Sequence, residues 1–436
     1  MYIAEILILV LSFVILLGIG VPIAFSIGIS TTLTMLVSID TIPAFTTVAQ
    51  RMATGLDSFA LLAIPFFILA GQLMNRGGIA GKLIDFAKVL VGRLPGGLAY
   101  VNIIASMLFG AISGSAVAAA SAIGGIMNPR MVKEGYSRPF SAAVNITSAT
   151  TGMIIPPSNI LIVYSLASGG VSIATLFIAG YIPGILVGFV LMLVAGIFSY
   201  NKNYPLDEQS SLKEAFFKFL DAIPSLVLLV VVIGGIIAGI FTATEASAVA
   251  VLYTFLLSMF IYRKVGWKDL PDILLQTVNT TSIVMILIGT SVGMSWVMSY
   301  ENLPQAVSNA LLSVSDNPII ILLLINLILL FVGIFMDMTP AVLIFTPIFL
   351  PVVTQIGMDP VHFGIVMVLN LCIGLCTPPV GSVLFVGCSV ANIGIDKVIK
   401  PLLPLFLAMV VALIIVTYVP ELSLWLPEVV RSWVSK

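Results

Sequence analysis

The sequence predicts an all-α, polytopic membrane protein made of two inverted-topology repeats, each with a re-entrant helical hairpin and a broken helix. Three observations lead to this prediction. Of the 436 residues, 60% are hydrophobic and only 8% are charged, whereas about 25% of the residues of a soluble domain are charged. Polar or glycine-rich breaks interrupt several long apolar segments. The breaks of the first half recur in the same order in the second half.

Apolar runs of about 17–25 residues are long enough to cross a bilayer as helices. Repeat 1 (1–200) is predicted to contain scaffold helices (4–38), an arm (58–94), a hairpin (98–129), a broken helix (139–168) and a helix (173–199). A polar, cytoplasmic linker is predicted at 201–221. Repeat 2 (222–436) is predicted to contain scaffold helices (223–262), an arm (273–315), a hairpin (319–356), a broken helix (360–390) and a helix (402–419).

The two hairpins are predicted from apolar segments with polar or glycine-rich centres, which favour two helical arms and a tip near mid-membrane. The alternative is a pair of full spans in each segment. Pro340, Pro347 and Pro351 argue against one long straight helix at 319–356, because proline removes a helical hydrogen bond. The segment 76–94 is amphipathic, which indicates an interfacial helix.

Four landmarks support the repeat. Each recurs in the second half, in the pairs Pro95 and Pro318, Asn102 and Asn326, Gly110 and Gly333, and Pro156 and Pro378. The offsets are 223, 224, 223 and 222 residues. A drift of no more than two residues is unexpected for unrelated halves, although side-chain identity is poor elsewhere.

Charged residues indicate opposite orientations for the two hairpins. Basic residues flank the first hairpin on both sides, whereas no Lys or Arg occurs from 299 to 360 around the second. Because cytoplasmic loops carry an excess of Lys and Arg, we expect the first hairpin to enter from the cytoplasm and the second from outside. Both termini then fall outside. Inverted repeats of this kind are a transporter architecture, with the site at the repeat interface.

Helices that stop at mid-membrane leave carbonyl oxygens and N–H groups without partners. Carbonyls and hydroxyls suit a small, hard cation such as Na⁺, and helix N-termini suit an anion. The first tip and break could form a cation site from Ser113, Ser115, Gly152, Ile155 and Pro157. The second could form one from Gly333, Asp337, Thr339, Cys376, Thr377 and Pro379. The alternative is a pair of proline kinks with Ser/Gly packing motifs.

Asp337 is the strongest single candidate. A carboxylate at bilayer depth costs at least ~2.5 kcal/mol, which favours a role as a cation ligand or proton carrier. Capping the helix that begins at Thr339-Pro340 is the alternative, and the two roles are compatible. Glu245 instead ends the S/T-x-x-E sequence Thr242-Ala243-Thr244-Glu245, which predicts a helix-capping box.

The composition also argues against several classes of function. A net charge of −1 with 18 basic residues leaves no basic face for nucleic acid. One histidine and one mid-membrane aspartate do not supply the paired groups of a hydrolase, so no enzyme is expected. No Lys or Arg lies in either tip or break, so an anionic substrate would depend on helix N-termini and bound cations. Asn145, Thr150, Thr151 and Asn159 are candidate hydrogen-bond donors to such a substrate.

Five motifs together resemble those of a known family. They are Pro65-Phe-Phe-Ile-Leu-Ala-Gly71, Gly110-Ala-Ile-Ser-Gly-Ser115, Gly152-Met-Ile-Ile-Pro-Pro-Ser158, Met336-Asp-Met-Thr-Pro340 and Thr377-Pro-Pro-Val-Gly381. Over essentially its whole length, the sequence resembles the large membrane subunit of TRAP (tripartite ATP-independent periplasmic) transporters.

This resemblance implies an elevator-type, Na⁺-coupled importer of an organic acid anion, of the C4-dicarboxylate or sialic acid class, in a bacterial inner membrane. Both termini would then be periplasmic. The implied partners are a small membrane subunit, a periplasmic substrate-binding protein, the substrate and the lipid bilayer. The resemblance places the Na⁺ sites on Ser113, Gly152, Ile155, Pro157, Asp337, Thr339, Cys376, Thr377 and Pro379. The alternative is a stand-alone, ion-coupled transporter of divalent anions.

Overall fold

The computed structural model describes residues 2–202, 204, 212–315, 317–378 and 381–434, and nearly all of them lie in helices. No strand occurs in these ranges. Eight helical segments within them are long and apolar enough to cross a membrane. The chain is therefore an all-α, multi-pass membrane protein, which confirms the fold class predicted from the sequence.

Corresponding helices follow one another in the same order in both halves. Those of the first half are α4 (Ala63–Arg76), α5 (Ile79–Val91), α6 (Gly97–Ser113), α7 (Ala116–Lys133), α8 (Arg138–Thr151), α9 (Asn159–Ala167) and α10 (Ile173–Asn201). Those of the second half are α13 (Leu270–Tyr300), α14 (Leu303–Val314), α15 (Pro318–Phe335), α16 (Met338–Gln355), α17 (Pro360–Gly374), α18 (Ser382–Val390) and α19 (Ile395–Tyr418). The pairs α6–α7 and α15–α16 are the hairpins, and the pairs α8–α9 and α17–α18 are the broken helices.

Each hairpin reverses direction within two residues. Gly114 and Ser115 join α6 to α7, and two residues likewise separate α15 from α16. Gly114 has a φ of 61°, a conformation that glycine adopts without a steric penalty at the end of a helix. Ser115 Oγ accepts a hydrogen bond from the N–H of Ala118 at 3.2 Å, which caps α7. The sharp reversal therefore follows from the local sequence.

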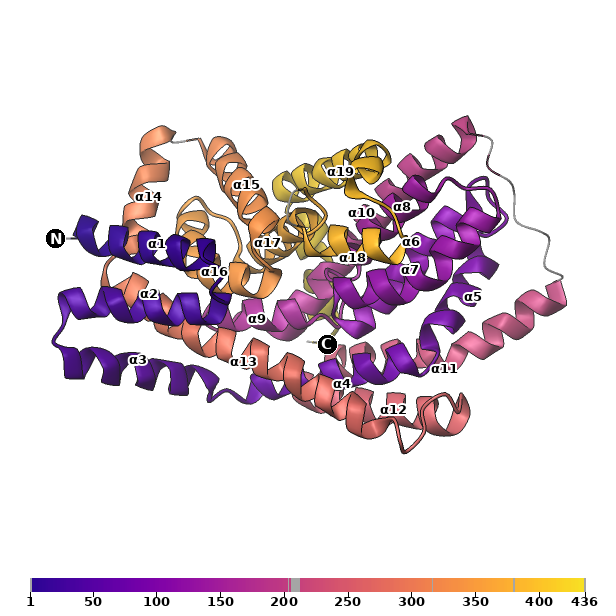
Figure 1. Ribbon diagram of the computed structural model, residues 1–436, viewed down its shortest axis with the longest axis horizontal. Helices are drawn as coiled ribbons and strands as arrows, with labels where there is room; N and C mark the ends of the chain where they lie inside the picture. Colours follow the sequence, from indigo (N-terminus) through magenta and orange to yellow (C-terminus); the bar gives the residue numbers. More distant parts are fainter. Residues whose placement is uncertain (1, 203, 205–211, 316, 379–380, 435–436) are drawn as a thin grey trace.

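The two repeats interleave in one body, the hairpin unit, which comprises α6–α10, α15–α19 and the C-terminal α20 (Glu421–Val434) (Figure 1). The second arm of each hairpin packs on the broken helix of the other repeat, α7 on α18 and α16 on α9. Tyr164 of α9 donates a hydrogen bond to the carbonyl of Pro360 in α17 at 2.6 Å. Neither half buries its apolar faces alone, so the two halves depend on each other.

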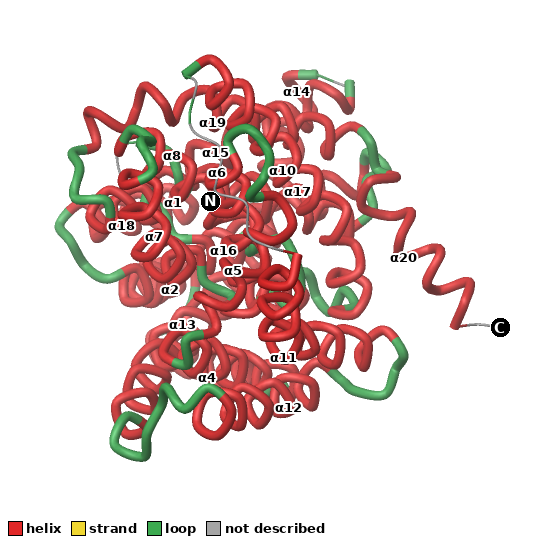
Figure 2. The backbone as a smooth tube through the Cα atoms, turned by 90° about the vertical axis from the view of Figure 1, so that its right-hand side faces the viewer, coloured by secondary structure: helices red, strands yellow, loops and turns green. Residues whose placement is uncertain are grey.

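A second body, the scaffold layer, lies along one side of the hairpin unit. It consists of α1 (Tyr2–Gly18), α2 (Ile23–Ser38), α3 (Thr41–Leu56), α11 (Leu212–Ile237), α12 (Ala243–Leu256) and the arm helices α4 and α13. The helix α13 packs against α2, α3 and α4, and α4 packs against α12. The end-on view shows α4, α11, α12 and α13 gathered below the hairpin unit (Figure 2).

Two helices, α3 and α20, were not anticipated from the sequence. Neither is a continuous apolar run: α3 contains Gln50 and Arg51, and α20 carries Glu and Arg residues. Gly55 of α3 approaches α13 so closely that an added Cβ atom would lie 2.7 Å from Val292. The guanidinium group of Arg51 in α3 lies 5.0 Å from the ring centre of Trp296, which is also in α13. Packing against a neighbour, not local hydropathy, therefore stabilises α3.

The predicted capping box at the start of α12 is confirmed. The N–H of Glu245 donates to Thr242 Oγ1 at 3.3 Å, and the N–H of Thr242 donates to Glu245 Oε2 at 2.8 Å. These reciprocal bonds satisfy two N–H groups that the first helical turn leaves without partners.

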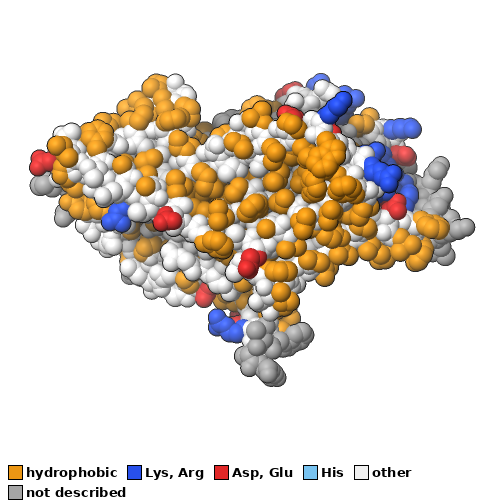
Figure 3. Space-filling model, turned by 90° about the horizontal axis from the view of Figure 1, so that it is seen from below, with side chains coloured by type: hydrophobic (Ala, Val, Ile, Leu, Met, Phe, Trp, Pro, Cys, Tyr) orange, Lys and Arg blue, Asp and Glu red, His pale blue; other side chains and the backbone are white. Residues whose placement is uncertain are grey.

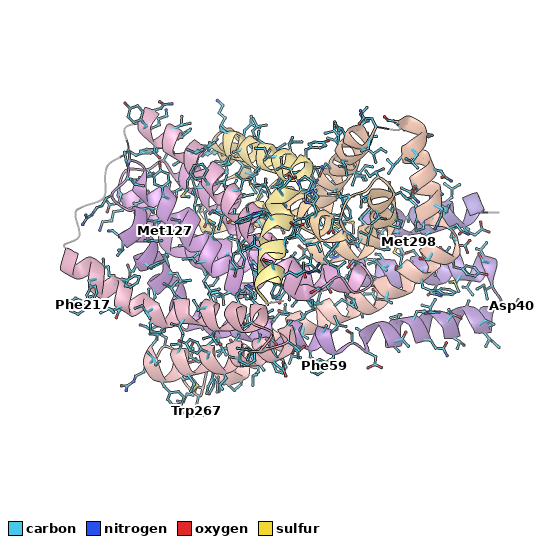
Figure 4. All side chains as sticks on the ribbon, turned by 180° about the vertical axis from the view of Figure 1, so that it is seen from behind. Asp40, Phe59, Met127, Phe217, Trp267 and Met298 are labelled. Carbon is cyan, nitrogen blue, oxygen red and sulfur yellow. The ribbon has the colours of Figure 1, made fainter. Side chains whose placement is uncertain are left out.

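Basic side chains gather toward one end of the molecule. Figure 3 shows Lys and Arg side chains concentrated at the right-hand end of a face that is otherwise largely hydrophobic. Phe217, near the start of α11, lies at this end, and Asp40, between α2 and α3, lies at the opposite end (Figure 4). The basic end is the one that the charge pattern assigns to the cytoplasm.

An ion pair connects the two arms at this basic end, and it provides a test of the packing of α4 on α13. Arg76 at the end of α4 pairs with Asp272 in the first turn of α13. The charge reversal Asp272→Arg should lower the thermal unfolding midpoint, because it replaces an attraction by a repulsion of up to about 1 kcal/mol. Adding Arg76→Asp should restore the midpoint toward the wild-type value. No recovery in the double variant would contradict a direct contact.

Candidate ion and substrate site

Each hairpin tip meets the break of its own broken helix at a contact between two glycines. A Cβ atom built on Gly152 would lie 2.4 Å from the Cα atom of Gly110, and one built on Gly374 would lie 2.6 Å from the Cα atom of Gly333. Real Cβ atoms do not approach so closely, so only glycine fits. The contacts place each tip beside the interruption of a helix, which is the arrangement expected of re-entrant hairpins.

Main-chain oxygens are available at the first break. No described residue donates a hydrogen bond to the carbonyl oxygens of Gly152, Ile155 or Pro157. The first tip crosses this break: a Cβ atom on Gly114 would lie 2.7 Å from Nδ2 of Asn159, two residues past Pro157. The structure therefore brings the tip residues next to unpaired carbonyls, which is the donor set that a hard cation such as Na⁺ prefers.

The hydroxyl groups of this tip have defined positions. Ser113 Oγ donates to the carbonyl oxygen of Ser115 at 3.5 Å, and Ser115 Oγ caps α7. The carbonyl of Ser113 faces α4, because a Cβ atom on Gly71 would lie 2.9 Å from it. The tip is thus held between its own break and the scaffold layer.

The second tip adds a carboxylate. Asp337 occupies the N-cap position of α16, and its carbonyl accepts a hydrogen bond from the N–H of Ala341 at 3.2 Å. Its side chain makes no capping hydrogen bond and is accessible. Thr339, in the first turn of α16, is half-buried beside it. Asp337 therefore stands where the capping interpretation places it, while its carboxylate is free to meet a ligand.

The second break uses its side chains for packing. Cys376 Sγ donates to the carbonyl of Ile146 in α8 at 3.4 Å, and Thr377 Oγ1 donates to the carbonyl of Ile373 in the preceding helix α17 at 2.8 Å. Cys376 thus offers a cation its main-chain oxygen and not its thiol. Pro379, the remaining candidate of this set, lies outside the described residues.

A cavity of about 450 Å³ lies where the two tips face the scaffold layer. Three helix N-termini open onto it, since its lining includes the first residues of α7, α9 and α16. The other walls come from α4 and α13. Asp337 is the only charged residue among those that line it. Helix N-termini carry partial positive charge, so this cavity can attract an anion without a basic side chain.

The four candidate substrate donors fall into two groups. Asn159 lines the cavity, and its Oδ1 atom is buried without a hydrogen-bond partner among the described residues. Asn145 is buried between α7 and α8, where its Nδ2 donates to the carbonyl of Ala120 at 2.9 Å. Thr150 and Thr151 are also fully buried, and their hydroxyls bond to carbonyls of their own helix. Asn159 alone of the four lines this cavity.

Sequence reasoning missed the polar residues that the arms contribute. Gln72 and Asn75 of α4 and Gln276 and Thr280 of α13 line the cavity opposite the tips. Their spacings of three and four residues put each pair on one helix face, a signal that was present in the sequence. Gly374 was also missed, although it lies 222 residues after Gly152, the same offset as that between Pro156 and Pro378.

Inverted repeats, re-entrant tips and a cavity at the repeat interface define a secondary-transporter architecture. A solved structure shows the same fold: the YdaH transporter of Alcanivorax borkumensis superposes with a TM-score of 0.61 at 12% sequence identity, and 90% of each chain is covered.

Sequence comparisons identify the family. The family model described as "Tripartite ATP-independent periplasmic transporter, DctM component" matches residues 10–422. Uncharacterized protein YgiK of Salmonella typhimurium is 57% identical over 98% of each chain. The C4-dicarboxylate TRAP transporter large permease protein DctM of Rhodobacter capsulatus is 39% identical over 94% of this chain and 96% of its own. The sialic acid TRAP transporter large permease protein SiaM of Vibrio cholerae is 40% identical over 87% of this chain and 89% of its own.

The chain therefore belongs to the DctM family of TRAP transporter large permeases. This confirms the resemblance that the five motifs indicate. Members of the family are transporter permeases, and the relatives named for their substrates act on organic acids.

The contact between Gly110 and Gly152 can be tested by a single methyl group. Gly152→Ala should lower the thermal unfolding midpoint, because overpacking typically costs about 1–3 kcal/mol. The control Gly125→Ala adds a methyl group that meets nothing within 4 Å. It should be neutral or stabilising, since alanine favours helices. Equal midpoints for Gly152→Ala and the control would show that the tip and the break are not in tight contact.

Proposed function

We propose that this chain is the transport subunit of a Na⁺-coupled importer that moves an organic acid anion across a bacterial inner membrane by an elevator mechanism. The observation that supports this proposal is the cavity where both hairpin tips and both arms meet. It combines features suited to an anion with a carboxylate that repels one.

The charge of the cavity favours an anion bound together with cations. The N-termini of α7, α9 and α16 attract an anion, while Asp337 carries a negative charge next to one of them. A bound Na⁺ at the second tip would offset this charge and strengthen anion binding. A second Na⁺ at the first tip would use the carbonyl oxygens of Gly152, Ile155 and Pro157, with Ser113 and Ser115 beside them. Transport of substrate and cation is coupled in such an arrangement, because each stabilises the other.

The division of the walls favours an elevator. The tips and the break belong to the hairpin unit, whereas the arm helices α4 and α13 belong to the scaffold layer. A movement of the hairpin unit along the scaffold layer would carry both cation sites and the substrate together. The movement would also bring other parts of the arms to face the cavity in place of the polar residues of α4 and α13. The access of the substrate to the two sides of the membrane would thereby alternate.

The family provides the remaining parts of the proposal. The substrate is an organic acid of the C4-dicarboxylate or sialic acid class, because relatives named for these substrates are about equally similar to this chain. A small membrane subunit and a periplasmic substrate-binding protein act as partners. Both termini face the periplasm, and the basic end faces the cytoplasm. In this proposal the chain performs transport and no catalysis.

The coupling ion can be tested in proteoliposomes that contain this chain, its small membrane subunit and its binding protein loaded with substrate. An inward Na⁺ gradient should drive accumulation of the substrate. Replacing Na⁺ with K⁺ should abolish accumulation, because the sites match the small cation and its gradient supplies the energy. Unchanged uptake in K⁺ would exclude Na⁺ coupling. Uptake by this chain without any other protein would favour the stand-alone carrier of divalent anions.

The role of Asp337 can be tested in the same assay. Asp337→Asn keeps the size of the side chain but removes its charge, so the Na⁺ concentration that gives half-maximal uptake should rise about tenfold or more, as expected for the loss of a charged ligand. Glu245→Gln, which changes a carboxylate at the start of α12, should leave the Na⁺ response unchanged. If Asp337→Asn retains the wild-type Na⁺ response, Asp337 serves as a helix cap only.

A further inference from the structure

A second crevice, of about 330 Å³, lies at the seam between the two repeats on the basic end of the hairpin unit. It is bounded by the end of α7, the start of α8 and the end of α18. Its lining consists of Asn128, Pro129, Val132, Lys133, Arg138, Val390, Ala391 and Asn392. It shares no residue with the cavity at the tips. Met127, adjacent to Asn128, lies on the same side of the molecule as Phe217 (Figure 4).

Two cations line this crevice. Lys133 and Arg138 are exposed, and neither forms an ion pair with another residue of the described ranges. Glu134 follows Lys133 in sequence but does not line the crevice. Arg138 is also the first residue of α8, whose N-cap Ser137 makes no side-chain capping hydrogen bond. Arg138 therefore lies at the positive end of a 14-residue helix, and Lys133, the last residue of α7, lines the same crevice.

A buried amide provides a separate indication of a ligand. Asn128 is only 3% exposed, and its Oδ1 accepts a hydrogen bond from Ser141 Oγ at 2.8 Å. Its Nδ2 is buried and has no partner among the described residues. Buried N–H groups are nearly always paired, so this donor lacks an acceptor at a crevice that also holds two cations. An anionic oxygen in the crevice would provide one.

We propose that this crevice binds a phosphate-bearing anion. Lys133 and Arg138 would contact the phosphate oxygens, and Asn128 Nδ2 would donate to one of them. Val132, Val390 and Ala391 form an apolar wall beside the cations, which suits the hydrocarbon of a phospholipid whose phosphate meets the cations. Basic pockets between helices at the cytoplasmic side of a membrane are known to hold phospholipid headgroups. Free phosphate has the same binding chemistry, so the experiment distinguishes the two sources.

Such a ligand would connect the two repeats. Its contacts come from α7 and α8 of repeat 1 and from α18 of repeat 2. These elements already pack against one another in the hairpin unit. A bound phosphate would therefore tighten the hairpin unit without touching the substrate cavity.

Footprinting of Lys133 tests this proposal directly. The full-length protein is placed in nanodiscs of phosphatidylcholine, in the same nanodiscs with sodium phosphate, and in nanodiscs that also contain phosphatidylglycerol. The rate at which an uncharged amine-reactive reagent acetylates each lysine is measured by mass spectrometry. Phosphatidylglycerol should slow the acetylation of Lys133 about fivefold or more relative to that of Lys397 and Lys400, which are exposed lysines outside the crevice. Equal slowing by free phosphate alone would identify a soluble anion as the ligand.

A matched pair of variants separates the crevice from the general charge of this end. Arg138→Gln should remove most of the protection of Lys133, because it removes one of the two cations that hold the phosphate. The control Arg130→Gln removes a charge from the same end of α7, outside the crevice, and should retain the protection. The proposal is overturned if Lys133 is acetylated at the same rate in all three preparations. It is also overturned if phosphatidylglycerol protects Lys133 as well in the Arg138→Gln variant as in the wild type.

Discussion

The contact of a hairpin tip with the break of a helix is the constraint on which the rest of the structure depends. Backbone approaches backbone at Gly110–Gly152 and at Gly333–Gly374, at distances that exclude any side chain. A break inside a membrane must have its polar groups covered by protein, water or ligand. The tips provide this cover, and they do so twice because the chain repeats. The proposed cation sites, the cavity and the short hairpins all lie at these two crossings.

The two crossings are related by the repeat but are not chemically equal. At the first break, the carbonyl of Thr150 accepts hydrogen bonds from the N–H of Met153 and from Cys372 Sγ of α17. The carbonyl of Gly152, two residues on, accepts none from a described residue. The thiols of Cys372 and Cys376 thus join the two broken helices, and the carbonyl oxygens of Gly152, Ile155 and Pro157 stay without a donor among the described residues. At the second crossing the accessible carboxylate of Asp337 is the distinctive group, so we expect the proposed second site to depend more on charge.

The sequence was informative where a physical signal is local. Long apolar runs, proline pairs and a two-residue glycine turn each constrain the backbone within a few residues, and they predicted the hairpins, the broken helices and the repeat. The helix α3 could not be predicted, because its stability comes from contact with α13, far away in the sequence. The same is true of Asn145 and Thr150, which are polar residues near a break but face neighbouring helices. Orientation about a helix axis depends on packing partners, and that information is not local.

Buried amides beneath each crossing make the asymmetry part of the packing as well. Asn370, one turn before Gly374, donates from Nδ2 to Oδ1 of Asn326 on the hairpin arm at 2.8 Å. In repeat 1 the equivalent position, 222 residues earlier, is Ser148, whose hydroxyl reaches Oδ1 of Asn102 at only 3.5 Å. A hydrogen bond in a low-dielectric interior is strong when its geometry is good. Ser148 Oγ also donates to Ser106 Oγ at 3.2 Å, and Ser106 Oγ donates to Asn102 Oδ1 at 3.3 Å, so repeat 1 has a chain of hydroxyls where repeat 2 has a direct bond between two amides. Close glycine packing is common to both crossings, so the two repeats differ in the polar groups that join each hairpin arm to its broken helix.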